Sequence, residues 1–264
     1  MLQVSGAVAV ITGGSGGIGE SLARCWVKNG GKVVLAARNL EKLRRVEEEV
    51  AEMGGEVVVT ACDVTREEDN HALARLAVEK FGAINLIVPA AGIINDSFLV
   101  SIDQDTGKAA EKMSLEQFQS VLDVNLTGVF LTVRACVVQM INLGCRGLIC
   151  LISSTGSLGT AGQLNYSSSK AAMSVMPDVL TAEFFRRNIA DRIRCVAVAP
   201  GYVATPMVKA VVQKVLDRIL EQVPIKRLIE PDEVATLIID LYRNEACAGE
   251  VFYIHGGLRL GSRG

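Results

Sequence analysis

The stretch Ala7-Val8-Ala9-Val10-Ile11-Thr12-Gly13-Gly14-Ser15-Gly16-Gly17-Ile18-Gly19 begins as an apolar run and ends in a glycine-rich turn. Glycine adopts positive φ at no steric cost and lets a ligand approach the backbone closely. Because a helix is expected to follow, free N–H groups and the positive end of its dipole lie at the turn, where they attract a pyrophosphate. The stretch therefore predicts a dinucleotide site. Its candidate contacts are Gly13, Ser15, Gly16, Gly17, Ile18 and Gly19.

Apolar runs alternate with helical stretches along the chain. Runs that are apolar throughout are buried on both faces, which is typical of a parallel sheet, and strand–helix alternation gives right-handed crossovers. The sequence predicts an α/β fold, a Rossmann-type doubly wound parallel sheet with helices on both faces, in a single domain over residues 1–264. Strands are expected at Ala7 to Thr12, Lys32 to Ala37, Glu56 to Ala61, Ile84 to Pro89, Gly147 to Ile152, Arg192 to Ala199 and Glu250 to Ile254. Helices are expected at Gly17 to Gly30, Leu40 to Met53 and Arg66 to Phe81.

Composition limits the partners. The chain has 264 residues, 50% of them hydrophobic, and a formal charge of -2 without a long basic run, so nothing supports nucleic acid or an anionic membrane as partner. No uninterrupted apolar run approaches the roughly 20 residues that span a bilayer, and the first residues lack the features of a signal peptide. We expect a cytoplasmic protein with a small-molecule ligand.

The cysteines and histidines do not indicate a metal site. The seven cysteines form no C-x-x-C pair, and most lie in apolar segments, so buried reduced thiols are favoured over disulfides or metal ligands. His71 and His255 lack ligand spacing, and neither is assigned a metal.

Two further segments stand out. Gly92 to Met113 resembles a loop of about twenty residues, longer than usual connections, and either a functional loop or a tolerated insertion fits it. Met207 to Leu228 is amphipathic and is the best candidate for a lid over the substrate.

The end of the second expected strand bears on the nucleotide. It reads Ala36-Ala37-Arg38-Asn39, where an acidic residue would accept hydrogen bonds from the adenosine ribose and repel a 2'-phosphate. The Arg38 guanidinium instead offers a fork to that phosphate, and Ser15 and Asn39 could add hydrogen bonds. This favours NADP(H) over NAD(H), with a solvated arginine at a helix start as the alternative.

The motif T-G-x-x-x-G-x-G at Thr12 to Gly19 resembles the nucleotide motif of the short-chain dehydrogenase/reductase family, and the similarity extends to His255-Gly256-Gly257. The resemblance implies that Ala91 and Gly92 approach the ribose. It also implies an adenine contact at Asp63 and Val64, although Asp63 could equally cap a helix. The turn at Pro200 and Gly201 is similar to the family's, which implies nicotinamide contacts at Val203 and Thr205. One departure is Pro89-Ala90, where the family usually has two asparagines.

The sequence also contains a candidate catalytic group. Tyr166 and Lys170 lie at i and i+4, on one face of an expected helix, and both are expected to contact the cofactor too. A nearby ammonium favours the phenolate, so Tyr166 could exchange a proton with a substrate oxygen. Ser153 precedes Tyr166 by 13 residues (166 minus 153), which resembles the family's interval and indicates Ser153 rather than Ser154 as the serine that holds the carbonyl. Asn125 matches the family's helix asparagine, which implies a proton relay to the lysine.

Three hypotheses follow. The first is an NADPH-dependent enzyme that reduces a ketone or aldehyde to an alcohol, with 3-oxoacyl-acyl carrier protein reductases as the subgroup that Leu228 to Ala235 resembles. The second is an NADP(H)-binding redox sensor or scaffold with little turnover. The third is a structural protein with a vestigial nucleotide motif. The family resemblance also implies a homo-oligomer, a tetramer or a dimer.

Overall fold

A single parallel sheet organises the molecule. The computed structural model describes residues 1–209 and 213–258, and it contains a seven-stranded sheet in the order β3-β2-β1-β4-β7-β8-β9. All its pairings are parallel, and the order reverses between β1 and β4. The strands are β1 (Val8–Thr12), β2 (Lys32–Ala37), β3 (Glu56–Ala61), β4 (Leu86–Pro89), β7 (Gly147–Ile152), β8 (Ile193–Pro200) and β9 (Val251–Ile254). The predicted doubly wound fold is confirmed.

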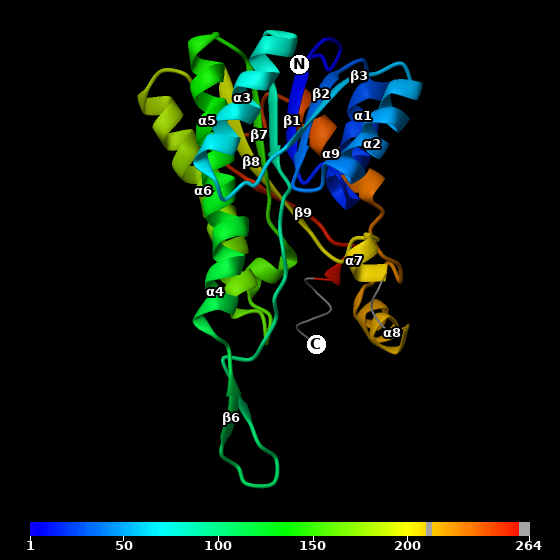
Figure 1. Ribbon diagram of the computed structural model, residues 1–264, viewed down its shortest axis with the longest axis vertical. Helices are drawn as coiled ribbons and strands as arrows, with labels where there is room; N and C mark the ends of the chain where they lie inside the picture. The colour runs from blue at the N-terminus through cyan, green and yellow to red at the C-terminus, as the bar shows by residue number, and fades with distance from the viewer. Residues whose placement is uncertain (210–212, 259–264) are drawn as a thin grey trace.

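Helices cover both faces of this sheet (Figure 1). Side chains from one face of the strands form a core with α1 (Gly17–Lys28), α2 (Leu40–Glu52) and α9 (Pro231–Arg243). The other face packs against α3 (Glu67–Phe81), α5 (Gly128–Asn142) and α6 (Leu164–Arg186). Buried valine, isoleucine and leucine on both sides of each central strand explain why the strands are apolar throughout.

Replacing the family's two asparagines by Pro89 and Ala90 leaves the pairing of β1 and β4 intact. Pro89 is the last residue of β4 and lies opposite Thr12. The ladder resumes one residue later, where the Ala90 N–H donates to the Thr12 carbonyl at 3.2 Å. The Ala91 N–H then lies 3.4 Å from the Thr12 hydroxyl, so Thr12 ties down the backbone after the strand.

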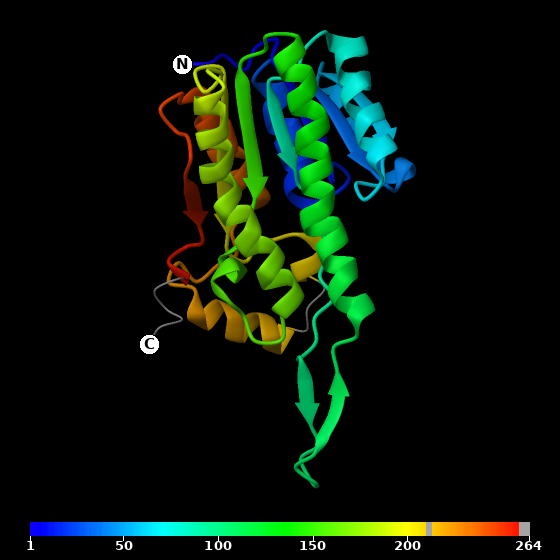
Figure 2. The ribbon, with the colours of Figure 1, turned by 90° about the vertical axis from the view of Figure 1, so that its left-hand side faces the viewer.

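The segment predicted as a loop contains a β-hairpin. Strands β5 (Val100–Ile102) and β6 (Ala109–Lys112) pair antiparallel and project from the body of the molecule (Figures 1 and 2). Asp103 builds the turn, because its carboxylate accepts hydrogen bonds from the Thr106 N–H and hydroxyl, both at 2.7 Å. The prediction of a loop was wrong here because the strands are short: β5 alternates apolar and polar residues over only three positions, and the fully exposed β6 does not alternate at all.

A long helix runs from the hairpin along the sheet. It comprises α4 (Leu115–Leu122), a π-helical turn η1 (Asp123–Thr127) and α5, and Figure 2 shows them as one continuous element. By length and composition this helix of 28 residues is apolar enough to cross a membrane, but 56% of its most apolar window is buried in the protein, as in a core helix. Polar side chains such as Asp123 interrupt the helix, so it contains no uninterrupted apolar run long enough to span a bilayer.

The predicted lid lies only partly in the described residues. They include α7 (Pro206–Lys209) and α8 (Gln213–Gln222), and residues 210–212 of the proposed lid lie outside them. The segment that follows α8 returns to the core, where Val203 pairs with Ile229 in an isolated β-bridge.

Candidate active site

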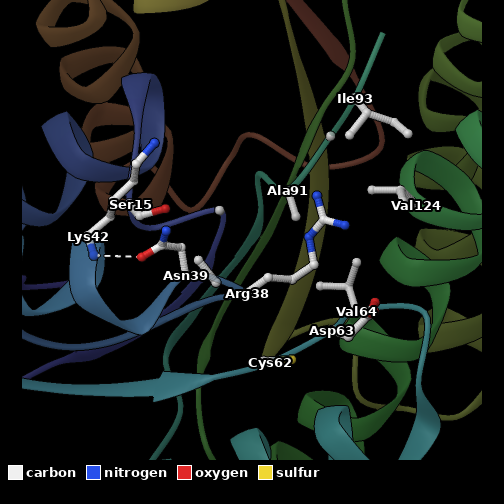
Figure 3. A pocket seen from close by; sticks show the side chains of 13 residues that line it. Ser15, Arg38, Asn39, Lys42, Cys62, Asp63, Val64, Ala91, Ile93 and Val124 are labelled. Carbon is white, nitrogen blue, oxygen red and sulfur yellow. Dashed lines mark hydrogen bonds between the residues drawn. The ribbon is translucent and has the colours of Figure 1, made fainter. Parts of the chain in front are cut away.

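A cleft of about 240 Å³ lies at the carboxyl ends of β1, β2, β3 and β4. This is the position beside the switch in strand order where open α/β sheets bind ligands. Figure 3 shows Ser15, Asn39 and Lys42 at one side of the cleft and Asp63 and Val64 at the other, with Arg38 between them. Eight of the predicted cofactor residues line it, namely Gly13, Ser15, Arg38, Asn39, Asp63, Val64, Ala91 and Gly92.

The glycine turn has no room for side chains at two of its positions. Gly13 has φ +67°, and a Cβ there would lie 2.7 Å from the backbone of Ala90. A Cβ on Gly19 would lie 2.5 Å from the Gly13 carbonyl oxygen. Gly16 is the N-cap of α1, and no side chain in the described part of the chain caps this helix. The turn therefore fits a pyrophosphate, because the first N–H groups of α1 are not occupied by a capping side chain.

The end of β2 supplies the polar groups for the outer part of the nucleotide. Arg38 and Asn39 are exposed, and the Asn39 carboxamide accepts a hydrogen bond from the Lys42 N–H at 2.9 Å, which caps α2. This cap brings Lys42, which the sequence reasoning missed, into the same cleft as Arg38. The sequence feature that could have indicated Lys42 is Asn39. An asparagine at the N-cap bonds to the backbone three residues later, which keeps residue 42 close to the end of β2.

Asp63 stabilises the turn before α3 and does not cap the helix. Its carboxylate accepts hydrogen bonds from the Thr65 N–H at 3.0 Å and the Thr65 hydroxyl at 2.8 Å. These bonds, and to a smaller extent the charge of Arg38, lower the pKa of Asp63. Since α3 begins after Arg66 without a side-chain cap, the alternative role of Asp63 as a helix cap is wrong.

The predicted nicotinamide contacts lie across from the glycine turn. Pro200 ends β8, and the Gly201 N–H donates to the Ile254 carbonyl at 2.9 Å. The Thr205 methyl group would lie 2.8 Å from a Cβ on Gly17, so Thr205 borders the glycine turn directly. Thr205 thus lies against the glycine turn, whereas Val203 is buried beside Ile229, and neither residue lines the cleft itself.

Lys170 and Tyr166 lie in the first turns of α6. Lys170 is buried, and its Nζ donates to the Ile152 carbonyl at 2.7 Å and lies 5.6 Å from the centre of the Tyr166 ring. Burial lowers the pKa of Lys170 to about 8. Burial also raises the pKa of Tyr166, a hydrogen bond with the Ser154 hydroxyl lowers it, and the charge of Asp96 raises it. The raised pKa keeps the Tyr166 phenol protonated at neutral pH, the form that can donate a proton.

The two serines after β7 differ in their contacts. Ser153 is 2% exposed, and its hydroxyl lies 2.9 Å from the Lys170 carbonyl and 2.8 Å from the Ser174 hydroxyl. Ser154 hydrogen-bonds with Tyr166 and accepts from the Gly156 N–H at 3.0 Å. Strand alternation explains the difference, because residue 153 continues the β7 face that packs against α6. In this structure Ser154 is thus the serine beside the Tyr166 hydroxyl.

Asn125 occupies the π-helical turn and is completely buried. Its carboxamide accepts from the Ile93 N–H at 2.8 Å, donates to the Ile93 carbonyl at 3.0 Å and lies 3.4 Å from the Ser169 hydroxyl. Asn125 therefore joins the chain after β4 to α6. The sequence did not indicate the π-helical turn, which is a common feature of functional sites.

The fold and the site together define a class of protein. The molecule combines a glycine-lined cleft at the carboxyl edge of a doubly wound sheet with a half-buried tyrosine next to a buried lysine. This combination is that of a nucleotide-dependent oxidoreductase, in which one group of residues holds the dinucleotide and the other exchanges a proton with the substrate.

Comparison with known proteins identifies the family. A family model described as short chain dehydrogenase matches residues 7–216, so the chain belongs to the short-chain dehydrogenase family. A 3-oxoacyl-acyl-carrier-protein reductase of Thermotoga maritima is 31% identical over 259 residues, covering 97% of this chain and 99% of that protein. A 3-hydroxyacyl-CoA dehydrogenase type-2 of Drosophila melanogaster is 33% identical over 265 residues, covering 98% and 99%. A crystal structure of a short-chain dehydrogenase/reductase from Brucella melitensis, named glucose/ribitol dehydrogenase, has a TM-score of 0.84 at 25% identity and covers 97% and 98%.

Proposed function

We propose that this protein is an NADPH-dependent oxidoreductase that reduces a ketone or aldehyde to an alcohol, with Tyr166 as general acid. The observation that carries the proposal is the half-buried Tyr166, which lies beside Ser154 and has the Lys170 Nζ 5.6 Å from the centre of its ring. Membership of the family supports oxidoreductase chemistry with a nicotinamide cofactor.

Charge in the cleft supports NADPH as the cofactor. Arg38 and Lys42 both line the cleft at the end of β2. The position directly after Ala37 is therefore basic and not acidic. A 2'-phosphate accepts charge-assisted hydrogen bonds from such groups, whereas a free ribose hydroxyl gains little from them. Gly13, Gly19 and the uncapped start of α1 fit the pyrophosphate.

The catalytic residues have separate tasks. When bound, NADPH supplies the hydride that adds to the carbonyl carbon. Tyr166 donates its phenolic proton to the carbonyl oxygen, which becomes the alcohol, and its raised pKa keeps the phenol in the protonated form that donates. Lys170 offers an ammonium close to the ring of Tyr166 and stabilises the phenolate left behind. Asn125 holds the backbone of Ile93, in the segment that follows β4, and completes the proposed proton relay.

The serine that orients the carbonyl is either Ser153, as its spacing indicates, or Ser154, as its contact with Tyr166 indicates. Ser153 must first leave its hydrogen bonds with the Lys170 carbonyl and Ser174. Rotation of one χ1 angle achieves this, because serine has three staggered rotamers.

The relatives suggest a substrate class. Two are named for acyl thioesters oxidised or reduced at the third carbon, one as an acyl-carrier-protein reductase and one as an acyl-CoA dehydrogenase. We propose 3-oxoacyl thioesters as the first substrates to test. We also place the protein in the cytoplasm.

The decisive experiment follows NADPH and NADH absorbance separately with purified protein and a panel of 3-oxoacyl thioesters, β-keto esters, aryl ketones and diketones. NADPH-selective oxidation with any of them supports the proposal. Tyr166→Phe is the matched control and removes a single oxygen atom. We expect its kcat to fall by about 10³-fold, within the range of general-acid catalysis. Near-normal turnover of this variant would rule Tyr166 out as the acid.

One observation favours the second function, an NADP(H)-binding sensor or scaffold. The hydroxyl of Ser153 hydrogen-bonds with the Lys170 carbonyl and the Ser174 hydroxyl and not with Tyr166. Tight NADPH binding without turnover on the whole panel would support this alternative.

The exposed apolar side chains on α5 and α6 support a homo-oligomer, a tetramer or dimer. They include Phe130, Val138, Ile141, Val175, Val179 and Phe185. Monomeric soluble proteins seldom expose large apolar patches. Light scattering on the purified chain measures the number of subunits.

A further inference from the structure

Asn165 is completely buried although its side chain is a polar amide. Its Nδ2 donates to the Asn95 carbonyl at 2.9 Å and to the Gln117 carbonyl at 3.1 Å. Its Oδ1 accepts from the N–H of Tyr166, the next residue, at 2.8 Å. Three of the hydrogen-bonding positions of the amide are therefore used, each by the backbone of a different segment.

These three segments meet at the start of α6. Asn95 belongs to the chain that enters the hairpin, Gln117 to α4, and Tyr166 to the first turn of α6. Two further bonds hold the hairpin base to the same place. The Ser97 N–H donates to the Gly162 carbonyl at 2.9 Å, and the Gln163 side chain donates to the Asp96 carboxylate at 2.7 Å.

The start of α6 lacks a side-chain cap from its own N-cap residue. Gln163 is the N-cap, and its side chain makes no cap hydrogen bond to the helix. The first N–H groups of a helix have no partner within the helix, so the bond from Tyr166 to Asn165 satisfies one of them. Asn165 thus fixes both the first turn of α6 and its distance from α4.

We propose that Asn165 is a positioning residue for Tyr166: it holds the tyrosine at its place in the site by tying the first turn of α6 to the hairpin base and to α4. This inference rests on the proposed function, in which Tyr166 donates the proton. Removing the amide takes one donor from each of the Asn95 and Gln117 carbonyls and the acceptor from the Tyr166 N–H. A displacement of about 1 Å at a catalytic group costs on the order of 10² in rate.

The test compares Asn165→Ala with Asn85→Ala. Asn85 also bridges two backbone groups, the Val8 N–H and the Arg146 carbonyl, both at 3.0 Å, but at the opposite edge of the sheet. We expect kcat to fall by about 10–100-fold in Asn165→Ala, with the Kd for NADPH unchanged within about 2-fold. We expect Asn85→Ala to keep its kcat at a similar loss of Tm. Asn165→Ser replaces the alanine variant if that protein does not fold.

Amide hydrogen exchange over the first turn of α6 gives a second readout that needs no turnover, so failure of the proposed function and failure of this inference are distinguishable. Exchange about 10-fold faster in Asn165→Ala than in wild type and Asn85→Ala supports the inference. Unchanged exchange, or a kcat loss no larger than that of Asn85→Ala, overturns it.

Discussion

The nucleotide cleft and the catalytic edge are built by opposite means. At the cleft, backbone and exposed side chains form the site, and Gly13 and Gly19 leave no space for a Cβ. At the catalytic edge, Asn125, Lys170 and their neighbours are buried polar side chains held by hydrogen bonds. An added atom should therefore harm the first region, whereas a removed polar group should harm the second. Four groups of substitutions test this contrast, from the largest expected effect to the smallest.

Lys170→Met should lower kcat by about 10³-fold while the protein stays folded, because the ammonium beside Tyr166 is lost. Burial lowers the pKa of Lys170 from 10.5 to about 8, and a depression of this size disfavours folding at pH 7 by about 3 kcal/mol. Methionine removes this cost but also removes the hydrogen bond to the Ile152 carbonyl, which offsets part of the stabilisation. We therefore expect the free energy of unfolding in urea to rise by about 1 kcal/mol.

The pH dependence of that stability checks the cause. Between about 8 and 10.5 the unfolded chain binds more protons at residue 170 than the folded chain. The stability of wild type therefore rises with pH across this window by more than its deficit at pH 7, so the order of wild type and Lys170→Met reverses by about pH 10. A constant difference from pH 7 to pH 10 would contradict the assigned cause.

Alanine at each of the two serines separates their roles. If Ser154 orients the carbonyl, Ser154→Ala should lower kcat by about 10²-fold, the usual loss for one oxyanion donor, and Ser153→Ala should lower it by less than about 5-fold. The reverse order would show that Ser153 turns from the Lys170 carbonyl towards the substrate. Steady-state kinetics at fixed NADPH concentration measure both, with circular dichroism as the control for folding.

Gly19→Ala should weaken NADPH binding by about 30-fold, because its Cβ would lie 2.5 Å from the Gly13 carbonyl oxygen and the turn must shift. Gly54→Ala is the control. It strains a turn after α2 with φ +79°, lies outside the cleft, and has no described atom within 4 Å of the added Cβ. Fluorescence titration with NADPH should show almost no change for the control; equal losses would mean that crowding is not the cause.

Arg38→Asp should weaken NADPH binding by about 10-fold relative to NADH, in keeping with the loss of a charge-assisted hydrogen bond. Lys42→Ala should give a smaller loss of about 3-fold in the same titration, since its exposed ammonium is screened by solvent. Arg45→Ala, on an exposed position of α2 outside the cleft, serves as the control. An unchanged ratio of NADPH to NADH affinity in Arg38→Asp would contradict the phosphate assignment.

The strands and the nucleotide cleft could be predicted from sequence because both depend on local pattern. Buried parallel strands need apolar residues on both faces, and the glycine turn needs glycine at set positions. Contacts that depend on tertiary geometry could not be predicted in this way. The spacing to Tyr166 indicated Ser153, but strand alternation turned its hydroxyl to α6. Lys42 lines the cleft because Asn39 caps α2, and the hairpin pairs a strand of only three residues with a second strand that shows no apolar alternation.

The two ends of the hairpin lie next to each other at its base, because the Met113 N–H donates to the Leu99 carbonyl at 3.1 Å. A segment whose two ends adjoin can be lengthened, shortened or exchanged without redirecting the chain on either side. The stretch from Val100 to Lys112 therefore behaves as a cassette. A peptide tag or a fluorescent domain grafted at its tip, near Asp105, would extend into solvent away from the sheet.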